Sequence, residues 1–170
     1  ISDDTEITVE CNPGTIDYDG FCALKSAGVN RISLGFQAAE DDMLKTLGRI
    51  HSVEDARIAV LDAQRAGIEN ISLDLMYGLP DMALEDAEKW IDYMTALNPT
   101  HISTYALKVE EGTPFAKMDL NLPDDDIVAD MYEKIVERLA EKGYARYEIS
   151  NFAKTGYESR HNLKYWNYAD

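Results

Sequence analysis

The segment from Asn70 to Pro80 most constrains how this chain can fold. From Ile71 to Leu75, large apolar side chains alternate with small polar ones, which is the period of a β-strand. One face of the strand is therefore apolar, and Asp74 ends the polar face. In barrels of parallel strands, functional groups lie at the carboxyl ends of the strands. Asp74 is thus a candidate site residue, with turn capping as the alternative.

Three further segments repeat this alternation and end in a hydrogen-bonding side chain. An ordinary eight-stranded barrel fills its centre with Val, Ile and Leu. Here Ser, Thr and Gly share the face of the terminal polar group, and the large apolar side chains lie on the opposite face, where helices would pack. A polar barrel interior indicates a polar ligand inside it. The segments are Ile7–Glu10 (a carboxylate), Ile32–Gln37 (an amide) and His101–Tyr105 (a phenol).

Helical patterns separate these strands and predict an α/β fold. Gly28–Ser33 resembles Gly67–Ser72 as an internal repeat, and a spacing of roughly 30–40 residues matches one βα unit. Four strands are too few to close a barrel, so we predict a partial parallel (β/α) barrel whose N-terminal strands lie outside this sequence. We expect strands at Ile7–Cys11, Arg31–Phe36, Ile71–Leu75 and His101–Tyr105, and helices at about Asp17–Ala27, Glu40–Leu47, Val53–Ala66 and Leu84–Leu97.

After residue 114 the pattern changes. We expect residues 1–114 to form the partial barrel, and residues 115–170 to add further elements to the same domain. These are a helix from Asp124 to about Lys142, a return strand at Arg146–Ser150 and a loop-like aromatic tail. The clustered aromatic side chains of the tail are expected to belong to the core.

The composition narrows the function classes. A formal net charge of −16 argues against nucleic-acid binding, which needs basic surface. No run approaches the ~20 apolar residues of a membrane span, so membrane association is not indicated. The spacing of Cys11 and Cys22 fits no zinc or iron–sulfur motif, which favours free thiols in a cytoplasmic protein. Because the sequence begins without Met, we expect it to be a piece of a longer protein.

Several motifs resemble one known family. Four of them are similar to the radical S-adenosylmethionine (SAM) core of the oxygen-independent coproporphyrinogen III oxidase family, and two in the tail are similar to its heme chaperone branch, which carries an H-N-x-x-Y-W signature. The first four are Glu10–Pro13, Gly28–Gln37, Leu47–His51 and Asp74–Pro80, and the two in the tail are Tyr147–Ala153 and His161–Trp166.

The resemblance implies cofactors and the residues that contact them. In the family, the groups at Glu10, Gln37, Arg49 and Asp74 contact SAM. Carboxylates suit its ammonium and ribose hydroxyls, and a guanidinium suits its carboxylate. For Arg49 the alternative is a surface ion pair, and for the two carboxylates it is capping or barrel hydrogen bonding. The C-x-x-x-C-x-x-C motif of the family is absent, so we expect a 4Fe-4S cluster only in the full-length protein.

His161 and the overall function each have more than one interpretation. His161, beside Tyr165 and Trp166, is either an axial heme ligand or a core residue that pins the tail. His51 and His101 are expected to be structural, or at most to lie near a cofactor. The resemblance implies a heme chaperone that binds SAM and delivers heme to an acceptor protein.

Two rival functions remain beside the chaperone. The first is an oxygen-independent coproporphyrinogen III oxidase that decarboxylates the propionates of a porphyrin precursor, so whether the protein is an enzyme stays open. The second is an unrelated barrel for a phosphorylated metabolite. It is disfavoured because no Gly-rich phosphate loop precedes a helix.

Overall fold

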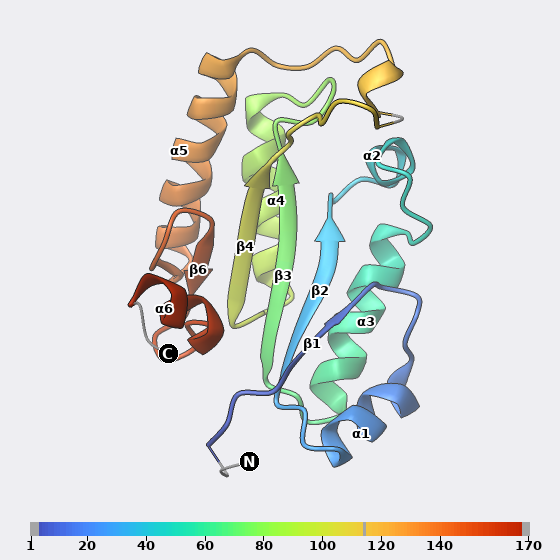
Figure 1. Cartoon of the computed structure of the whole chain (residues 1–170), viewed down its shortest axis with the longest axis vertical. Helices are drawn as coiled ribbons and strands as arrows, with labels where there is room; N and C mark the ends of the chain where they lie inside the picture. Colours follow the sequence, from blue (N-terminus) through green and yellow to red (C-terminus); the bar gives the residue numbers. More distant parts are fainter. Residues whose placement is uncertain (1–3, 114, 168–170) are drawn as a thin grey trace.

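The computed structural model describes residues 4–113 and 115–167. Strands and helices alternate through the first part of the chain, followed by a helix-rich C-terminal part (Figure 1). The first part contains β1 (Thr8–Cys11), α1 (Tyr18–Ser26), β2 (Arg31–Gln37), α2 (Asp41–Thr46), α3 (Val53–Arg65), β3 (Asn70–Tyr77), α4 (Leu84–Ala96) and β4 (His101–Ala106). The second contains η1 (Phe115–Lys117), α5 (Asp125–Glu141), β5 (Ala145–Arg146), β6 (Asn151–Ala153) and α6 (Arg160–Trp166).

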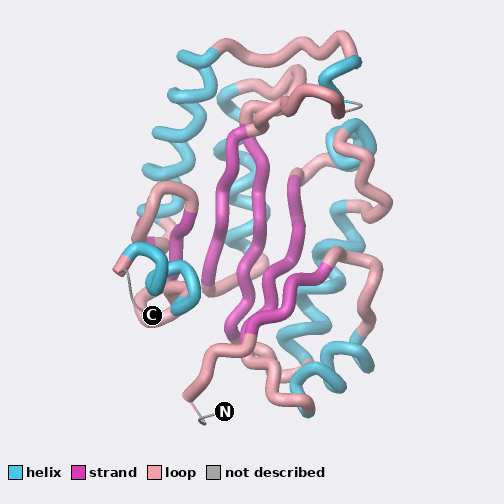
Figure 2. The backbone as a smooth tube through the Cα atoms, viewed as in Figure 1, coloured by secondary structure: helices cyan, strands magenta, loops and turns pink. Residues whose placement is uncertain are grey.

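The strands form one sheet in the order β1-β2-β3-β4-β6-β5. The first four strands are parallel, whereas β6 runs antiparallel to β4, and β5 antiparallel to β6. Figure 2 shows α3 and α4 behind the sheet and α6 in front of it. The predicted α/β class, with a parallel arc of strands, is confirmed. The division at residue 114 stays a prediction, although β6 extends the same sheet as β4.

The internal repeat is reproduced in the register of the sheet. Ile32 pairs with Ile71, and Ser33 pairs with Ser72, so equivalent residues of the two βα units lie side by side. The two isoleucines are 0% and 1% exposed and pack against the helices. Fully burying a side chain of this size stabilises the fold by about 1.5–3 kcal/mol. The alternation therefore sends the apolar face to the core and leaves the polar face for the pocket described below.

Local signals in the sequence mark both ends of α3. The Ser52 hydroxyl accepts from the backbone N–H of Asp55 at 3.1 Å, and the Asp55 carboxylate accepts from the backbone N–H of Ser52 at 2.8 Å. This reciprocal pair caps two donors at the start of α3. Gly67 follows the helix with a φ of 81°, a conformation that favours glycine. No helix within residues 4–113 and 115–167 is long and apolar enough to span a bilayer.

The predicted return strand at Arg146–Ser150 is wrong. Two short strands, β5 and β6, flank a loop at residues 147–150. The Glu148 carboxylate accepts from the backbone N–H of Ser150 at 2.8 Å and also bonds the Asn151 side-chain amide. A carboxylate that bonds the backbone two residues further on closes a turn. This turn bends the chain where the sequence analysis expected it to stay extended.

The tail also differs from the prediction, because it contains the helix α6. The Ser159 hydroxyl accepts from the backbone N–H of Asn162 at 3.4 Å and caps this helix. Tyr165 and Trp166 are 71% and 57% exposed, so these aromatic residues are not part of the core. Tyr168 of the predicted aromatic cluster lies outside the described residues.

Candidate functional site

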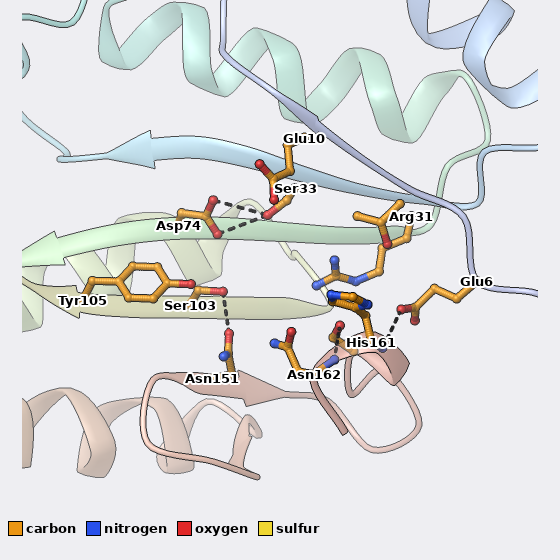
Figure 3. A pocket seen from close by; sticks show the side chains of 12 residues that line it. Glu6, Glu10, Arg31, Ser33, Asp74, Ser103, Tyr105, Asn151, His161 and Asn162 are labelled. Carbon is orange, nitrogen blue, oxygen red and sulfur yellow. Dashed lines mark hydrogen bonds between the residues drawn. The ribbon is translucent and has the colours of Figure 1, made fainter. Parts of the chain in front are cut away.

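A polar pocket of about 470 Å³ opens on the sheet face opposite the helices α3 and α4. Its walls come from the inward positions of β1 to β4 and from β6, the following loop and α6 (Figure 3). The interior is polar because these strands carry Ser, Thr and charged side chains at every second position. Its lining residues are Glu6, Thr8, Glu10, Arg31, Ser33, Asp74, Ser103, Tyr105, Asn151, Ser159, His161 and Asn162.

Two of the predicted SAM contacts, Glu10 and Asp74, line this pocket together. Glu10 is exposed on β1 and pairs in register with Ser33. The Ser33 hydroxyl donates to the two Asp74 carboxylate oxygens at 3.1 and 3.3 Å. Burial raises the pKa of Asp74, and the hydrogen bonds from Ser33 oppose that shift. The pocket therefore presents two carboxyl groups with oxygen atoms that can accept further hydrogen bonds.

The other two predicted SAM contacts, Gln37 and Arg49, do not line this pocket. Gln37 ends β2 with a φ of 68°, and its amide lies over Gly35, where an added Cβ would come within 2.9 Å of Gln37 Nε2. Arg49 follows α2 and is half-buried. Its Nε is buried without a hydrogen-bond partner in the part of the chain that the structure describes. Arg49 thus keeps a free donor, whereas its assignment to SAM stays a prediction.

A partly buried chain of hydrogen bonds runs from the sheet to the pocket wall. His101 Nδ1 is 2.8 Å from Ser72 Oγ, and His101 Nε2 is 2.7 Å from the Tyr147 hydroxyl. That hydroxyl oxygen also accepts from the Ser159 backbone N–H and the Asn162 side chain, both at 3.3 Å. With both lone pairs used, the hydroxyl donates to Nε2, so the imidazole is protonated at Nδ1. These hydrogen bonds connect the sheet to α6.

The two buried histidines are surrounded by protein groups, and their structural role stays a prediction. Burial, with the nearby charge of Arg31, lowers the pKa of His101 to about 3, so the ring is neutral. His51 is 6% exposed, and its Nε2 lies 3.5 Å from the Phe36 carbonyl oxygen. Burial also lowers the pKa of His51. Sequence reasoning did not find the partner of His101, because Tyr147 lies 46 residues away in the chain.

His161 stands at the pocket wall on α6, with its side chain exposed. Its imidazole makes no hydrogen bond within residues 4–113 and 115–167, and it contacts Tyr165 edge to face at 5.1 Å between ring centres. Other groups hold the helix. The Glu6 carboxylate accepts from the backbone N–H groups of Arg160 and His161 at 3.1 and 3.4 Å. The Asn162 side chain donates to the Tyr147 hydroxyl. The imidazole is therefore accessible to a ligand.

The described residues do not fit an iron–sulfur cluster. Cys11 and Cys22 are free, and no group of three or more His, Cys, Asp or Glu side chains in the described ranges could hold a metal ion. Burial raises the pKa of the Cys11 thiol, which disfavours the thiolate that metals need. The pocket carboxylates and Arg49, in contrast, do fit the chemistry of SAM. They offer the carboxylates of Glu10 and Asp74 as acceptors and the unpartnered Arg49 Nε as a donor.

Comparison with solved structures identifies the fold. The chain matches the structure of the Escherichia coli coproporphyrinogen III oxidase HemN, described as a radical SAM enzyme, with a TM-score of 0.82 at 24% identity. The match covers 98% of this chain and 38% of the other. This likeness confirms the predicted α/β fold of the radical SAM type.

Comparison with curated sequences finds closer relatives. The chain is 45% identical over 167 residues to the heme chaperone HemW of Escherichia coli, and 44% identical over 169 residues to that of Bacillus subtilis. These matches cover 98% and 97% of this chain but 44% and 45% of the relatives, so the chain spans less than half of their length. The model of the radical SAM superfamily matches residues 1–94, which is more than half of the chain. The chain belongs to the radical SAM superfamily.

Proposed function

We propose that this protein is a heme chaperone of the HemW type, which binds heme and SAM and delivers the heme to an acceptor protein in the cytoplasm. The observation that carries the proposal is the free imidazole of His161 at the wall of a polar pocket. Neutral imidazole is a common axial ligand of heme iron. Tyr165 and Trp166 on the same helix are exposed and supply apolar surface for a macrocycle.

For SAM, we propose contacts from Glu10, Gln37, Arg49 and Asp74. SAM contributes an ammonium, a carboxylate, a ribose diol and a sulfonium. The carboxylates of Glu10 and Asp74 suit the ammonium and the hydroxyls, and the donors of Arg49 suit the carboxylate. A cation beside Asp74 would also reverse the pKa shift that burial imposes on that carboxyl group. In this proposal the 4Fe-4S cluster is held in the full-length protein by cysteines outside this sequence.

The chaperone is favoured over the rival coproporphyrinogen III oxidase. The likeness to the Escherichia coli oxidase, at 24% identity, bears on the fold alone. The relatives that support the chaperone are 44–45% identical over nearly the whole chain and carry the name heme chaperone. Release of carbon dioxide from coproporphyrinogen III by the reconstituted intact protein would reverse this preference.

The heme proposal is tested by substituting the imidazole in the intact protein. We expect His161→Ala to shift the Soret band of bound heme and to weaken heme binding, while the melting temperature stays unchanged because the side chain is exposed. Lys164→Ala, an exposed change on the same helix, serves as the matched control and should leave the spectrum unaltered. A lower melting temperature with an unchanged Soret band would assign His161 a structural role.

The SAM proposal is tested at Arg49. Removing one partner of a buried charge pair costs on the order of 2–5 kcal/mol, or roughly tenfold or more in affinity. We therefore expect Arg49→Ala to weaken SAM binding by that factor in calorimetry on the reconstituted intact protein. Arg57→Ala is the control, because Arg57 pairs with Glu54 on the surface of α3. If Arg49→Ala binds SAM as tightly as Arg57→Ala does, Arg49 does not contact SAM.

A further inference from the structure

Arg31 is a buried cation that has no ion-pair partner among the described residues. It begins β2, its side chain lines the pocket, and it is only 6% exposed. Its Nε is buried without a hydrogen bond, and the guanidinium forms no ion pair within residues 4–113 and 115–167. A guanidinium stays charged at any physiological pH, so it cannot avoid the cost of burial by losing its proton. An anion at the position that the guanidinium faces would offset this cost of burial.

The neighbours of Arg31 do not supply that anion. Glu6, Glu10 and Asp74 line the same pocket, yet none of them pairs with Arg31 within 4.0 Å in the described part of the chain. Glu6 is bonded to the backbone at the start of α6, and Asp74 to Ser33. The His101 ring is neutral, and the Tyr147 hydroxyl is committed to it. The donors of Arg31 are therefore left for a ligand.

We propose that Arg31 forms a carboxylate-binding subsite in this pocket. The guanidinium presents its donors as a planar fork, which matches the two oxygens of a carboxylate. Figure 3 shows Arg31 and His161 at the wall of the same pocket. Under the proposed function, on which the choice of ligands rests, two molecules bring a carboxylate to this wall: heme through a propionate, and SAM through its α-carboxylate, for which Arg31 is then the partner in place of Arg49.

The subsite is tested first without either large ligand. In the intact protein labelled with ¹⁵N at arginine, the Nε–H resonance of Arg31, assigned by its loss in Arg31→Gln, should shift and saturate on titration with propionate. Propionamide, which has the same shape without the charge, should give no shift. Absence of a saturable propionate shift overturns the subsite, whatever the fate of the heme and SAM proposals.

The two possible sources are separated by ligands that lack the carboxylate. If heme supplies it, the wild-type protein should bind heme roughly tenfold or more tightly than heme dimethyl ester, and Arg31→Gln should abolish that preference. If SAM supplies it, the same contrast should hold between SAM and decarboxylated SAM. Arg31→Lys should restore only part of the preference, because an ammonium lacks the planar fork.

Controls separate a ligand contact from a structural role. Arg146→Gln removes an exposed arginine that bonds the Tyr132 hydroxyl, and it should leave both preferences intact. If Arg31→Gln fails to fold, the comparisons on the wild-type protein still decide: equal binding of each ligand and its carboxylate-free form overturns the subsite. If the wild type binds neither heme nor its ester, the heme proposal fails, and the propionate titration and the SAM comparison still test Arg31.

Discussion

The neutral imidazole of His101 makes the stability of this fold depend on pH. Its pKa is about 3 in the folded chain, against an ordinary value of 6.5. Below pH 6.5 the unfolded chain therefore binds a proton that the folded chain excludes. The contribution of this difference in proton binding to the free energy of unfolding is complete above pH 6.5. It is lost progressively as the pH falls toward 3, by up to about 1.4 kcal/mol per pH unit.

This linkage predicts the behaviour of His101→Gln. We expect the free energy of unfolding of the wild type, measured with urea from pH 7 to pH 4, to fall more steeply than that of the variant. The variant is less stable at pH 7, because it breaks the bonds to Ser72 and Tyr147, and the difference narrows in acid. Parallel curves for the two proteins would mean that His101 titrates normally in the folded state.

At the scale of single residues, the sequence predicted some of the residues that line the pocket. Glu10 and Asp74 were found because the period of two places both at inward positions near the ends of strands, and both line one pocket. Arg31 was missed as a site residue, although the same period puts it on the inner face with Ser33. A charged residue at the start of a strand is usually solvated, and only the packing of the other elements shows that this one is buried.

At the scale of elements, prediction succeeded where strands were long and parallel. The expected bounds of the first four strands lie within two residues of the observed ones, because alternating side chains mark each strand. The two short C-terminal strands have two and three residues, which is too few for any period to be seen. Helix α6 was missed because residues distant in the sequence hold it. These are Glu6, just before β1, and Tyr147, in the loop after β5.

Those contacts predict how α6 depends on Glu6. The Glu6 carboxylate accepts from the backbone of Arg160, 154 residues further along the chain, so Glu6→Gln should weaken the docking of the helix. We expect faster hydrogen exchange at the amides of residues 160–166, with little change in the exchange of β3. Glu111→Gln, an exposed change away from α6, is the control. Unaltered exchange in α6 would show that the Tyr147 network holds the helix without Glu6.

At the scale of the whole molecule, one sheet face packs against helices and the other lines the pocket. The pocket collects residues from near β1 through to α6, so it exists only when distant parts of the chain have assembled. Its three carboxyl groups and one buried guanidinium suit a ligand that carries both a cation and a carboxylate. Opposite charges on one ligand satisfy both kinds of group at once, which a purely anionic or cationic ligand would not do.

The distribution of cysteines gives the last prediction. A 4Fe-4S cluster is held by cysteine thiolates, and this sequence has two cysteines. Within the described residues, no cluster of metal-binding side chains compensates for the missing ligands. We therefore expect the 170-residue chain to take up no 4Fe-4S cluster on anaerobic reconstitution with iron and sulfide, and to give the same visible absorption and iron content as a Cys11→Ser, Cys22→Ser double variant. Uptake of about four irons per chain, lost in that variant, would show that the two cysteines take part in a cluster site.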